Sequence, residues 1–184
     1  MVDLITYERI VRELASTKSS VVYYNSGNDH ATIVLENILL SARKNVKFLT
    51  GGFNHLVCED KDKRFVSALK KFLLNNGKLE VVMNRYLNDK TAYNSVLDVL
   101  KQYSSTTQYR QNISVKYLAE EFQYKGFNVH FAVADSSMYR LEYDTEKFLA
   151  EFSFNGTSKC TELESKFKEI FDKATSLDLS TLKY

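Results

Sequence analysis

The chain has 184 residues, of which 44% are hydrophobic, so it can bury a substantial core. No Pro- or Gly-rich linker divides it, and we therefore expect a single domain over residues 1–184. Its 25 basic and 23 acidic residues nearly balance, so no broad electrostatic footprint for DNA or for a membrane surface is evident.

The amino-terminal part alternates helices and strands. Apolar residues recur at helical spacing over residues 7–14, and residues 21–24 then predict a strand. A loop leads to a second apolar stripe over residues 31–42, which predicts a well-formed helix. This helix leads directly into a short strand at residues 46–50, stopped by two glycines.

The same rhythm repeats in the middle of the chain. Helical spacing over residues 65–73 is followed by a compact apolar strand at 79–83. A third helix is predicted over 92–103, and the polar run 104–112 predicts an exposed loop before a strand at 113–118. Successive strands joined by helices favour a mostly parallel sheet that is covered on both faces.

The pattern changes to a β-meander near the carboxyl end. Strands are predicted at residues 128–134, 138–143 and 149–154, joined by short turns. An amphipathic helix over residues 162–174 then closes the chain. The predicted fold class is therefore α/β, with a mixed, mostly parallel sheet flanked by helices on both faces and a carboxyl-terminal meander and helix.

Polar residues interrupt the strands of this meander at fixed spacing. Asn128 and His130 are two residues apart, so they point to the same face of a β-strand, and Asp135 falls where that strand enters a turn. Ser153 and Asn155 follow at the end of the last predicted strand. A polar residue inside an apolar strand needs a structural or functional reason, so these five residues are the candidate site.

This layout resembles the phospholipase D superfamily. Its members carry a motif of His, any residue, Lys, four residues and Asp, and then a Gly-Ser-any-Asn element about one hairpin later. Asp135, Ser153 and Asn155 are in register with that motif, and the order of the surrounding elements follows the family along nearly the whole chain. The resemblance implies a phospholipase D-like fold with a pocket that faces phosphate.

Two departures from the motif bear on catalysis. Asn128 stands where the family has its nucleophilic His, and His130 stands where the family has Lys, while Phe152 replaces the Gly before Ser153. An amide side chain has no basic nitrogen and cannot attack phosphorus. The leading hypothesis is a catalytically degenerate domain that binds a phosphate-bearing ligand or a protein partner. Within it, the resemblance favours nucleic acid over membrane lipid and implies a prokaryotic or phage defence or restriction context.

Two alternatives remain open. His130 is itself a possible nucleophile of a metal-independent phosphodiesterase or nuclease, in which a homodimer would bring a second copy of His130 as the general acid. The other alternative is a purely structural interaction module, in which side chains fill the old pocket. Since a single-motif domain resembles half of the two-lobed enzymes, the resemblance also predicts a homodimer.

Further candidates are sparse. His55 follows the strand at 46–50 and Arg85 follows the strand at 79–83, and ligands gather beside the carboxyl ends of such strands. No cofactor fingerprint or metal-ligand spacing stands out, so we expect neither a cofactor nor a metal. Cys58 and Cys160 are too few for a disulfide framework. No apolar run approaches the roughly 20 residues that span a bilayer, which predicts a cytoplasmic protein.

Overall fold

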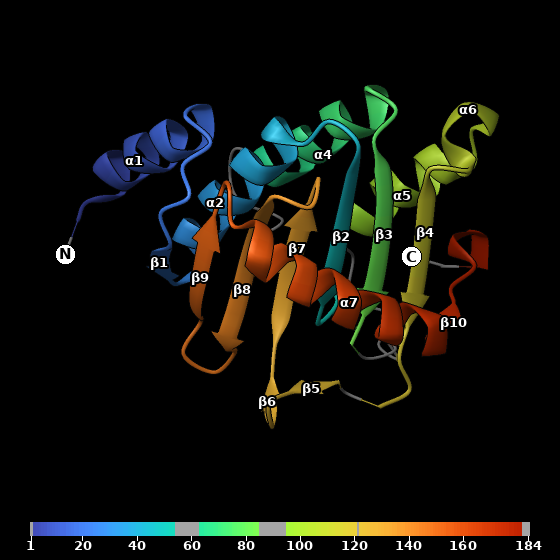
Figure 1. Cartoon of the computed structure of the whole chain (residues 1–184). Helices are drawn as coiled ribbons and strands as arrows, with labels where there is room; N and C mark the ends of the chain where they lie inside the picture. The colour runs from blue at the N-terminus through green and yellow to red at the C-terminus, as the bar shows by residue number, and fades with distance from the viewer. Residues whose placement is uncertain (1, 54–62, 85–94, 121, 182–184) are drawn as a thin grey trace.

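The computed structural model describes residues 2–53, 63–84, 95–120 and 122–181. It contains an eight-stranded sheet of order β1-β9-β8-β7-β2-β3-β4-β10, with helices on both faces (Figure 1). A separate two-stranded hairpin, β5-β6, projects from one edge of this sheet. The α/β class and the helices on both faces were predicted from the sequence and are confirmed.

The amino-terminal elements follow the predicted order. They are α1 (Leu4–Ser16), β1 (Tyr23–Ser26), α2 (Asn28–Ser41) and β2 (Asn45–Thr50). The side chain of Asp3 caps α1, because it accepts a hydrogen bond from the Thr6 amide at 3.0 Å. Strand β1 begins two residues later than predicted, and the two valines before it are exposed.

The middle of the chain also matches, with one addition. It contains α4 (Arg64–Leu74), β3 (Lys78–Met83), α5 (Ser95–Ser104) and β4 (Ile113–Tyr117). The predicted residues 92–94 of the third helix lie outside the described residues. The predicted loop before β4 contains a single helical turn, α6 (Thr107–Arg110), which packs a tyrosine ring 5.3 Å from a ring of α5.

The meander departs from the prediction at its first strand. The predicted strand 128–134 is split into β6 (Phe127–Asn128), which pairs with β5 (Gln123–Tyr124), and β7 (His130–Ala134), which joins the main sheet. The other two strands, β8 (Met138–Asp144) and β9 (Leu149–Ser153), match the predicted strands and end within one residue of the predicted ends. Asn128 and His130 therefore belong to different strands.

The last helix, α7 (Thr157–Lys173), begins five residues before the predicted start. It is followed by β10 (Thr175–Ser176) and a 3-10 turn, η1 (Leu179–Thr181), neither of which was predicted. Strand β10 pairs antiparallel with β4 and is the last strand in the order of the sheet.

Parallel pairing is confined to the centre of the sheet. β2 pairs parallel with β3, and β3 pairs parallel with β4, through the helical crossovers that the sequence indicated. The neighbours from β2 to β1 are antiparallel because the meander continues the sheet beyond β2 and ends against β1, and β10 also pairs antiparallel with β4. The sheet is mixed, as predicted, but only the β2–β3 and β3–β4 pairs of the described strands are parallel, so it is not mostly parallel.

Each face of the sheet has its own apolar core. On the face covered by α1, α2, α4 and α5, called the α2 face, residues such as Phe48, Val81 and Phe152 are buried. On the opposite face, called the α7 face, Leu49, Phe131 and the apolar stripe of α7 pack together. Burial of each such side chain contributes about 1.5–3 kcal/mol. Since successive strand residues alternate between the two cores, the register fixes which side chains reach each face.

The helices on the α2 face are tied together by one arginine. Arg64, at the start of α4, forms ion pairs with Glu8 of α1 at 2.8 Å and with Glu36 of α2 at 2.5 Å. These contacts hold α1 against α2. None of the helices in the described ranges is long and apolar enough to cross a membrane.

Candidate functional site

The ends of the strands lie along two opposite sides of the sheet, which differ in chemistry and are called edges here. At one edge, here called the carboxyl edge, the parallel strands β2, β3 and β4 end, and the antiparallel strand β7 begins. At the other, the amino edge, β2 begins and β7 ends. Ligands of open α/β sheets bind beside the carboxyl ends of the parallel strands. His130, the first residue of β7, lies at this carboxyl edge.

His130 is held by a buried carboxylate. Its Nδ1 lies 2.8 Å from Oε2 of Glu142, which is its direct cross-strand neighbour on β8. The His130 side chain is 31% exposed, whereas that of Glu142 is 11% exposed. A neutral imidazole that donates from Nδ1 to this carboxylate keeps a basic lone pair on Nε2.

Arg140 completes a three-residue network. Its Nη2 donates to Oε1 of Glu142 at 3.1 Å, and the two residues are two apart on β8, so both point to the α2 face. Burial by itself raises the pKa of the Glu142 carboxyl, but the hydrogen bond from His130 and the positive charge of Arg140 together hold that pKa below its ordinary value. Glu142 is therefore a buried carboxylate that orients His130.

The Nε2 atom of His130 lies over the end of β2. A Cβ atom built on Gly51 would come within 2.9 Å of Nε2 and 3.1 Å of Cε1. Only a residue without a side chain leaves the imidazole in this position. No hydrogen-bond partner of Nε2 lies among the described residues.

Asn128 does not share a strand face with His130. It lies in β6, where its register partner is Gln123, and its side chain is exposed. The chain turns at Lys125 and Gly126, both with positive φ, which is the geometry of a two-residue hairpin. The structure therefore places Asn128 two residues before His130 on the projecting hairpin, outside the buried network.

Asp135 lies at the amino edge, at the far end of β7. Its carboxylate accepts hydrogen bonds from three consecutive backbone amides, those of Arg43, Lys44 and Asn45, at 2.7, 2.9 and 2.9 Å. These bonds tie the end of α2 to the start of β2. The structure gives Asp135 a capping role and does not bring it to His130.

Ser153 and Asn155 are also at the amino edge. Ser153 ends β9 opposite Tyr139, on the α7 face, and its hydroxyl donates to the Ser19 carbonyl at 3.3 Å. Asn155 is exposed. The next residue, Gly156, donates its amide to the Ser137 carbonyl in the turn beyond Asp135. These two motif residues are therefore separated from His130 by the length of the strands.

His55 and Arg85 lie outside the described residues. Within the described residues, no group of three or more His, Cys, Asp or Glu side chains is arranged to hold a metal ion. Cys160 is buried in the α7-face core. Burial raises the pKa of its thiol to about 12, so it carries no reactive thiolate near neutral pH.

Sequence reasoning missed Glu142 and Arg140, although a signal was present. They form an opposite-charge pair two residues apart in an otherwise apolar strand, so they share one face. Since the hairpin turn places Ala134 opposite Met138, counting back along the two strands places His130 opposite Glu142. The network was therefore accessible from the sequence.

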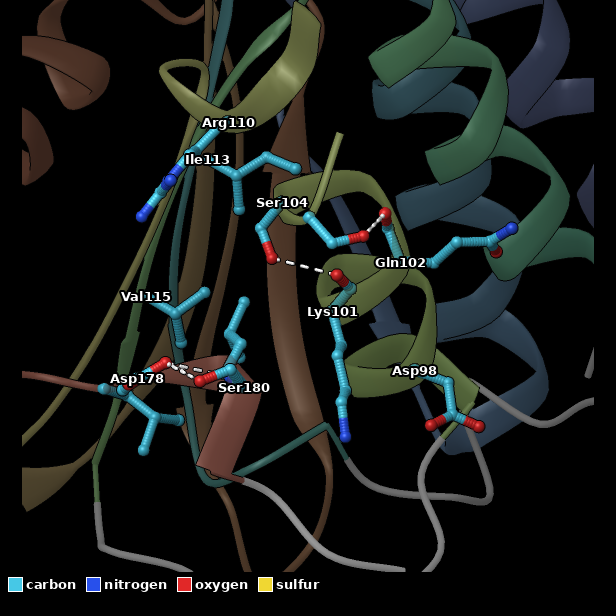
Figure 2. Close-up of a pocket in the computed structure, with 12 residues that line it drawn as sticks. Asp98, Lys101, Gln102, Ser104, Arg110, Ile113, Val115, Asp178 and Ser180 are labelled. Carbon is cyan, nitrogen blue, oxygen red and sulfur yellow. Dashed lines mark hydrogen bonds between the residues drawn. The ribbon is translucent and has the colours of Figure 1, made fainter. Parts of the chain in front are cut away.

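Figure 2 shows a hollow, away from the His130 network, between α5, β4 and η1, and its volume is about 790 Å³. Its lining includes the apolar Val115, the cations of Lys101 and Arg110, and the carboxylates of Asp98 and Asp178. This balance of charge favours no particular class of ligand. The hollow is lined by none of the residues of the His130 network.

By sequence, the chain matches no family model and no curated protein. Solved structures do resemble it in fold. The chain matches NucT from Helicobacter pylori with a TM-score of 0.58 and 15% identity, over 85% of this chain and 100% of that one. It matches Nuc from Salmonella typhimurium, a phospholipase D family member, with a TM-score of 0.56 and 10% identity, over 86% and 97% of the two chains.

These likenesses define the class: the chain has the phospholipase D-like α/β fold. It also matches TrmBL2, an archaeal chromatin protein with a novel mode of DNA binding, with a TM-score of 0.58 and 12% identity. That match covers 94% of this chain but only 62% of TrmBL2. At such identities the likeness extends to the fold and not to the chemistry of the site.

Proposed function

We propose that the chain is a catalytically degenerate phospholipase D-like domain that binds a phosphate-bearing ligand at the carboxyl edge of its sheet. The observation that supports this most directly is His130, half-buried and oriented through Nδ1 by Glu142, with Nε2 left for a ligand. Asn128, at the motif position of the nucleophile, is an exposed amide that cannot attack phosphorus. The site therefore keeps a phosphate-binding imidazole without the motif's nucleophile.

The charges of the network suit an anion when His130 is protonated. Arg140 and His130 then carry two positive charges against the single negative charge of Glu142. A phosphate oxygen at Nε2 would receive a charge-assisted hydrogen bond from a ring that is already fixed in orientation.

We favour nucleic acid as the ligand and a homodimer as the assembly. One of the structural neighbours supports nucleic acid, since TrmBL2 is described as a chromatin protein with a novel mode of DNA binding. The proposal includes the prokaryotic or phage defence or restriction context that the family resemblance implies. A protein partner at the same edge is the competing form of this proposal.

One observation favours a second candidate, an active phosphodiesterase. A carboxylate that holds the Nδ1 of a His and leaves Nε2 open is the arrangement of an activated nucleophile or base. In that case Nε2 of His130 would attack phosphorus, the leaving oxygen would take a proton from His130 of a second copy, and water would then release the phosphohistidine. This reaction requires the homodimer and no metal.

The test combines hydrolysis and binding on the same preparations. Wild type, His130→Ala and the surface control Asn155→Ala are assayed on a phosphodiester reporter and on single- and double-stranded DNA and RNA, with chelator present. The degenerate domain is expected to hydrolyse none of them but to bind nucleic acid in a titration, with His130→Ala weaker by about tenfold or more. Hydrolysis that is absent only from His130→Ala establishes the enzyme instead. A folded wild type that binds no nucleic acid and hydrolyses nothing contradicts both and leaves an interaction module.

A further inference from the structure

Most of the unpartnered buried polar atoms among the described residues come from neighbouring elements on the α2 face. In the part of the chain that the structure describes, they are Tyr7 Oη, Asn25 Nδ2 and Oδ1, Asn28 Oδ1, Asn45 Oδ1 and Arg140 Nε. Only Asn45 lies at the amino edge. The others come from α1, the end of β1, the start of α2, and β8. Since a buried polar group without a partner is costly, such a concentration calls for partners from outside the described residues, such as water or a bound ion.

The register places Asn25 in the same row as the His130 network. Asn25 faces Ala150, Ala150 faces Glu142, and Glu142 faces His130, across four neighbouring strands. Asn25 is only 5% exposed, and neither atom of its amide has a partner among the described residues. Between Asn25 and Glu142, Ala150 presents only a methyl group, so the polar side chains on either side are not separated by a bulky one.

The first turn of α2 begins directly after β1, on the side of the sheet called the carboxyl edge. Its N-cap residue is Gly27, which supplies no side-chain cap. The first amide of α2 with a helical acceptor is that of Ala31, which leaves the amides of Asn28, Asp29 and His30 without an acceptor among the described residues. An uncapped start of a 14-residue helix attracts anions through these amides and through the helix dipole.

Tyr7 connects this helix start to Arg140. Its ring stacks on that of His30 in the first turn of α2, with centroids 3.9 Å apart. Burial raises the pKa of the Tyr7 hydroxyl, and the positive charge of Arg140 opposes that rise, so the two groups lie within electrostatic reach. Arg140 is 5% exposed, and its Nε is one of the unpartnered donors.

The geometry points to a phosphate-monoester subsite formed by the uncapped start of α2, by Asn25 in the same row of the sheet as His130, and by Arg140 in the next row. The inference deepens the proposed function and rests on it in taking phosphate as the ligand. The donors are the three helix amides, the Asn25 amide, the Tyr7 hydroxyl and Arg140 Nε, which suit the several oxygens of one phosphate group. Glu142 does not repel the anion because Arg140 and His130 already engage it. Asp29 is exposed.

The chemistry allows two sources of the phosphate, free inorganic phosphate or the terminal phosphate of a nucleic acid. An internal phosphodiester is a poor fit because Asn25, Tyr7 and Arg140 are all at least nine-tenths buried, and a continuous strand has to leave the site at both ends. A chain end, or a free phosphate, needs only one opening. The subsite thus predicts a preference for phosphorylated ends over unphosphorylated ones.

The test is an NMR titration of the full chain with inorganic phosphate. Saturable shifts of the Asn28, Asp29 and His30 amides are expected, and Asn25→Asp is expected to weaken binding at least about tenfold, because its carboxylate would occupy the same donors. Asn155→Asp makes the same change of charge on the exposed surface and should bind phosphate like wild type. Thermal unfolding checks that Asn25→Asp is folded; a folded variant that binds phosphate as well as wild type contradicts the inference.

Oligonucleotides with and without a 5′-phosphate distinguish the two sources. Competition by the phosphorylated one alone assigns the subsite to chain ends, and competition by neither, with phosphate still bound, assigns it to free phosphate. If phosphate leaves the three amides unmoved while His130→Ala still weakens nucleic-acid binding, only water fills the site and the inference fails, although the proposed function stands. If phosphate moves these amides but no nucleic acid binds, the nucleic-acid part of the proposed function fails instead.

Discussion

The two ends of strand β7 show how a structural polar residue differs from a candidate functional one. At the amino edge, both oxygens of Asp135 are engaged by three backbone amides. At the carboxyl edge, His130 uses only Nδ1 for hydrogen bonds to the described residues, and Asn25 and Arg140, on other strands of the same face, have unpartnered donors. A side chain whose hydrogen-bonding capacity is used within the fold stabilises that fold, whereas one with spare capacity is available to a ligand.

The difference also explains how one sequence motif contains residues of both kinds. Asp135 follows His130 by five residues, and the length of the strand carries it to the opposite edge. The spacing between the two residues is thus compatible with two separate roles. Substitutions at each end should separate stability from ligand binding.

Asp135→Ala is expected to have the largest effect on stability. It removes three hydrogen bonds to a charged acceptor, and it places alanine at a φ of 50°, where asparagine and aspartate are better tolerated. We expect a loss of about 3–5 kcal/mol in the free energy of unfolding, measured by chemical denaturation. Asp135→Asn should recover part of this loss. Ligand affinity per folded molecule should not change, and a loss of affinity in folded Asp135→Asn would refute the separation of the two edges.

Glu142→Gln is expected to cost roughly 3 kcal/mol near neutral pH, because it leaves Arg140 buried without its counter-charge. The folded-state pKa of Glu142 lies below its ordinary value of 4.5, so the carboxylate stabilises the fold above about pH 4.5. This contribution is lost as the pH falls through the folded-state pKa. The difference between variant and wild type, followed by denaturation at several pH values, should therefore shrink in acid. A difference that is constant with pH would show that Glu142 is not ionised in the fold.

Much of the fold was predictable because periodicity reports burial directly. The alternation of β2 between the two cores and the apolar stripe of α4 follow from residue spacing alone. The split of the predicted strand 128–134 was missed because Phe127 to Val129 continues a strand pattern. The local signal in the sequence was Gly126 after Lys125, because the separate hairpin turns at these two residues with positive φ at both.

The candidate site was only partly predictable. His130 was found because a polar residue interrupts an apolar strand, and its position at the carboxyl edge follows from the order of the strands. Ser153 and Asn155 matched a motif by spacing along the chain, but β8 and β9 form a full hairpin before them, so the end of β9 returns to the amino edge. Asn25 and Arg140 gain their interest from unpartnered buried atoms, which only coordinates reveal.

Gly51→Ala tests the position of the His130 ring with a smaller effect on stability. The new methyl group would lie 2.9 Å from Nε2, so the imidazole has to move, but the backbone of Gly51 needs no positive φ and only the end of a side chain is displaced. We expect about 1 kcal/mol or less of destabilisation and a clear loss of ligand affinity. Gly126→Ala is not a suitable control for a glycine substitution, because Gly126 has a φ of 83° and any side chain there would strain the backbone. Unchanged affinity in Gly51→Ala would indicate that the ligand does not contact Nε2.

Asn155→Ala should have the smallest effect, although Asn155 fits the family motif in register. Its side chain is exposed at the amino edge, and its backbone amide, which donates to the Ser153 hydroxyl at 3.3 Å, is unaffected by the substitution. We expect a change within about 0.5 kcal/mol in stability and no change in ligand binding. Because His130→Ala is expected to weaken ligand binding, a comparison of the two variants measures whether the binding site lies at the carboxyl edge or at the motif residues. A loss of binding in Asn155→Ala comparable to that in His130→Ala would mean that the motif, and not the edge, locates the site.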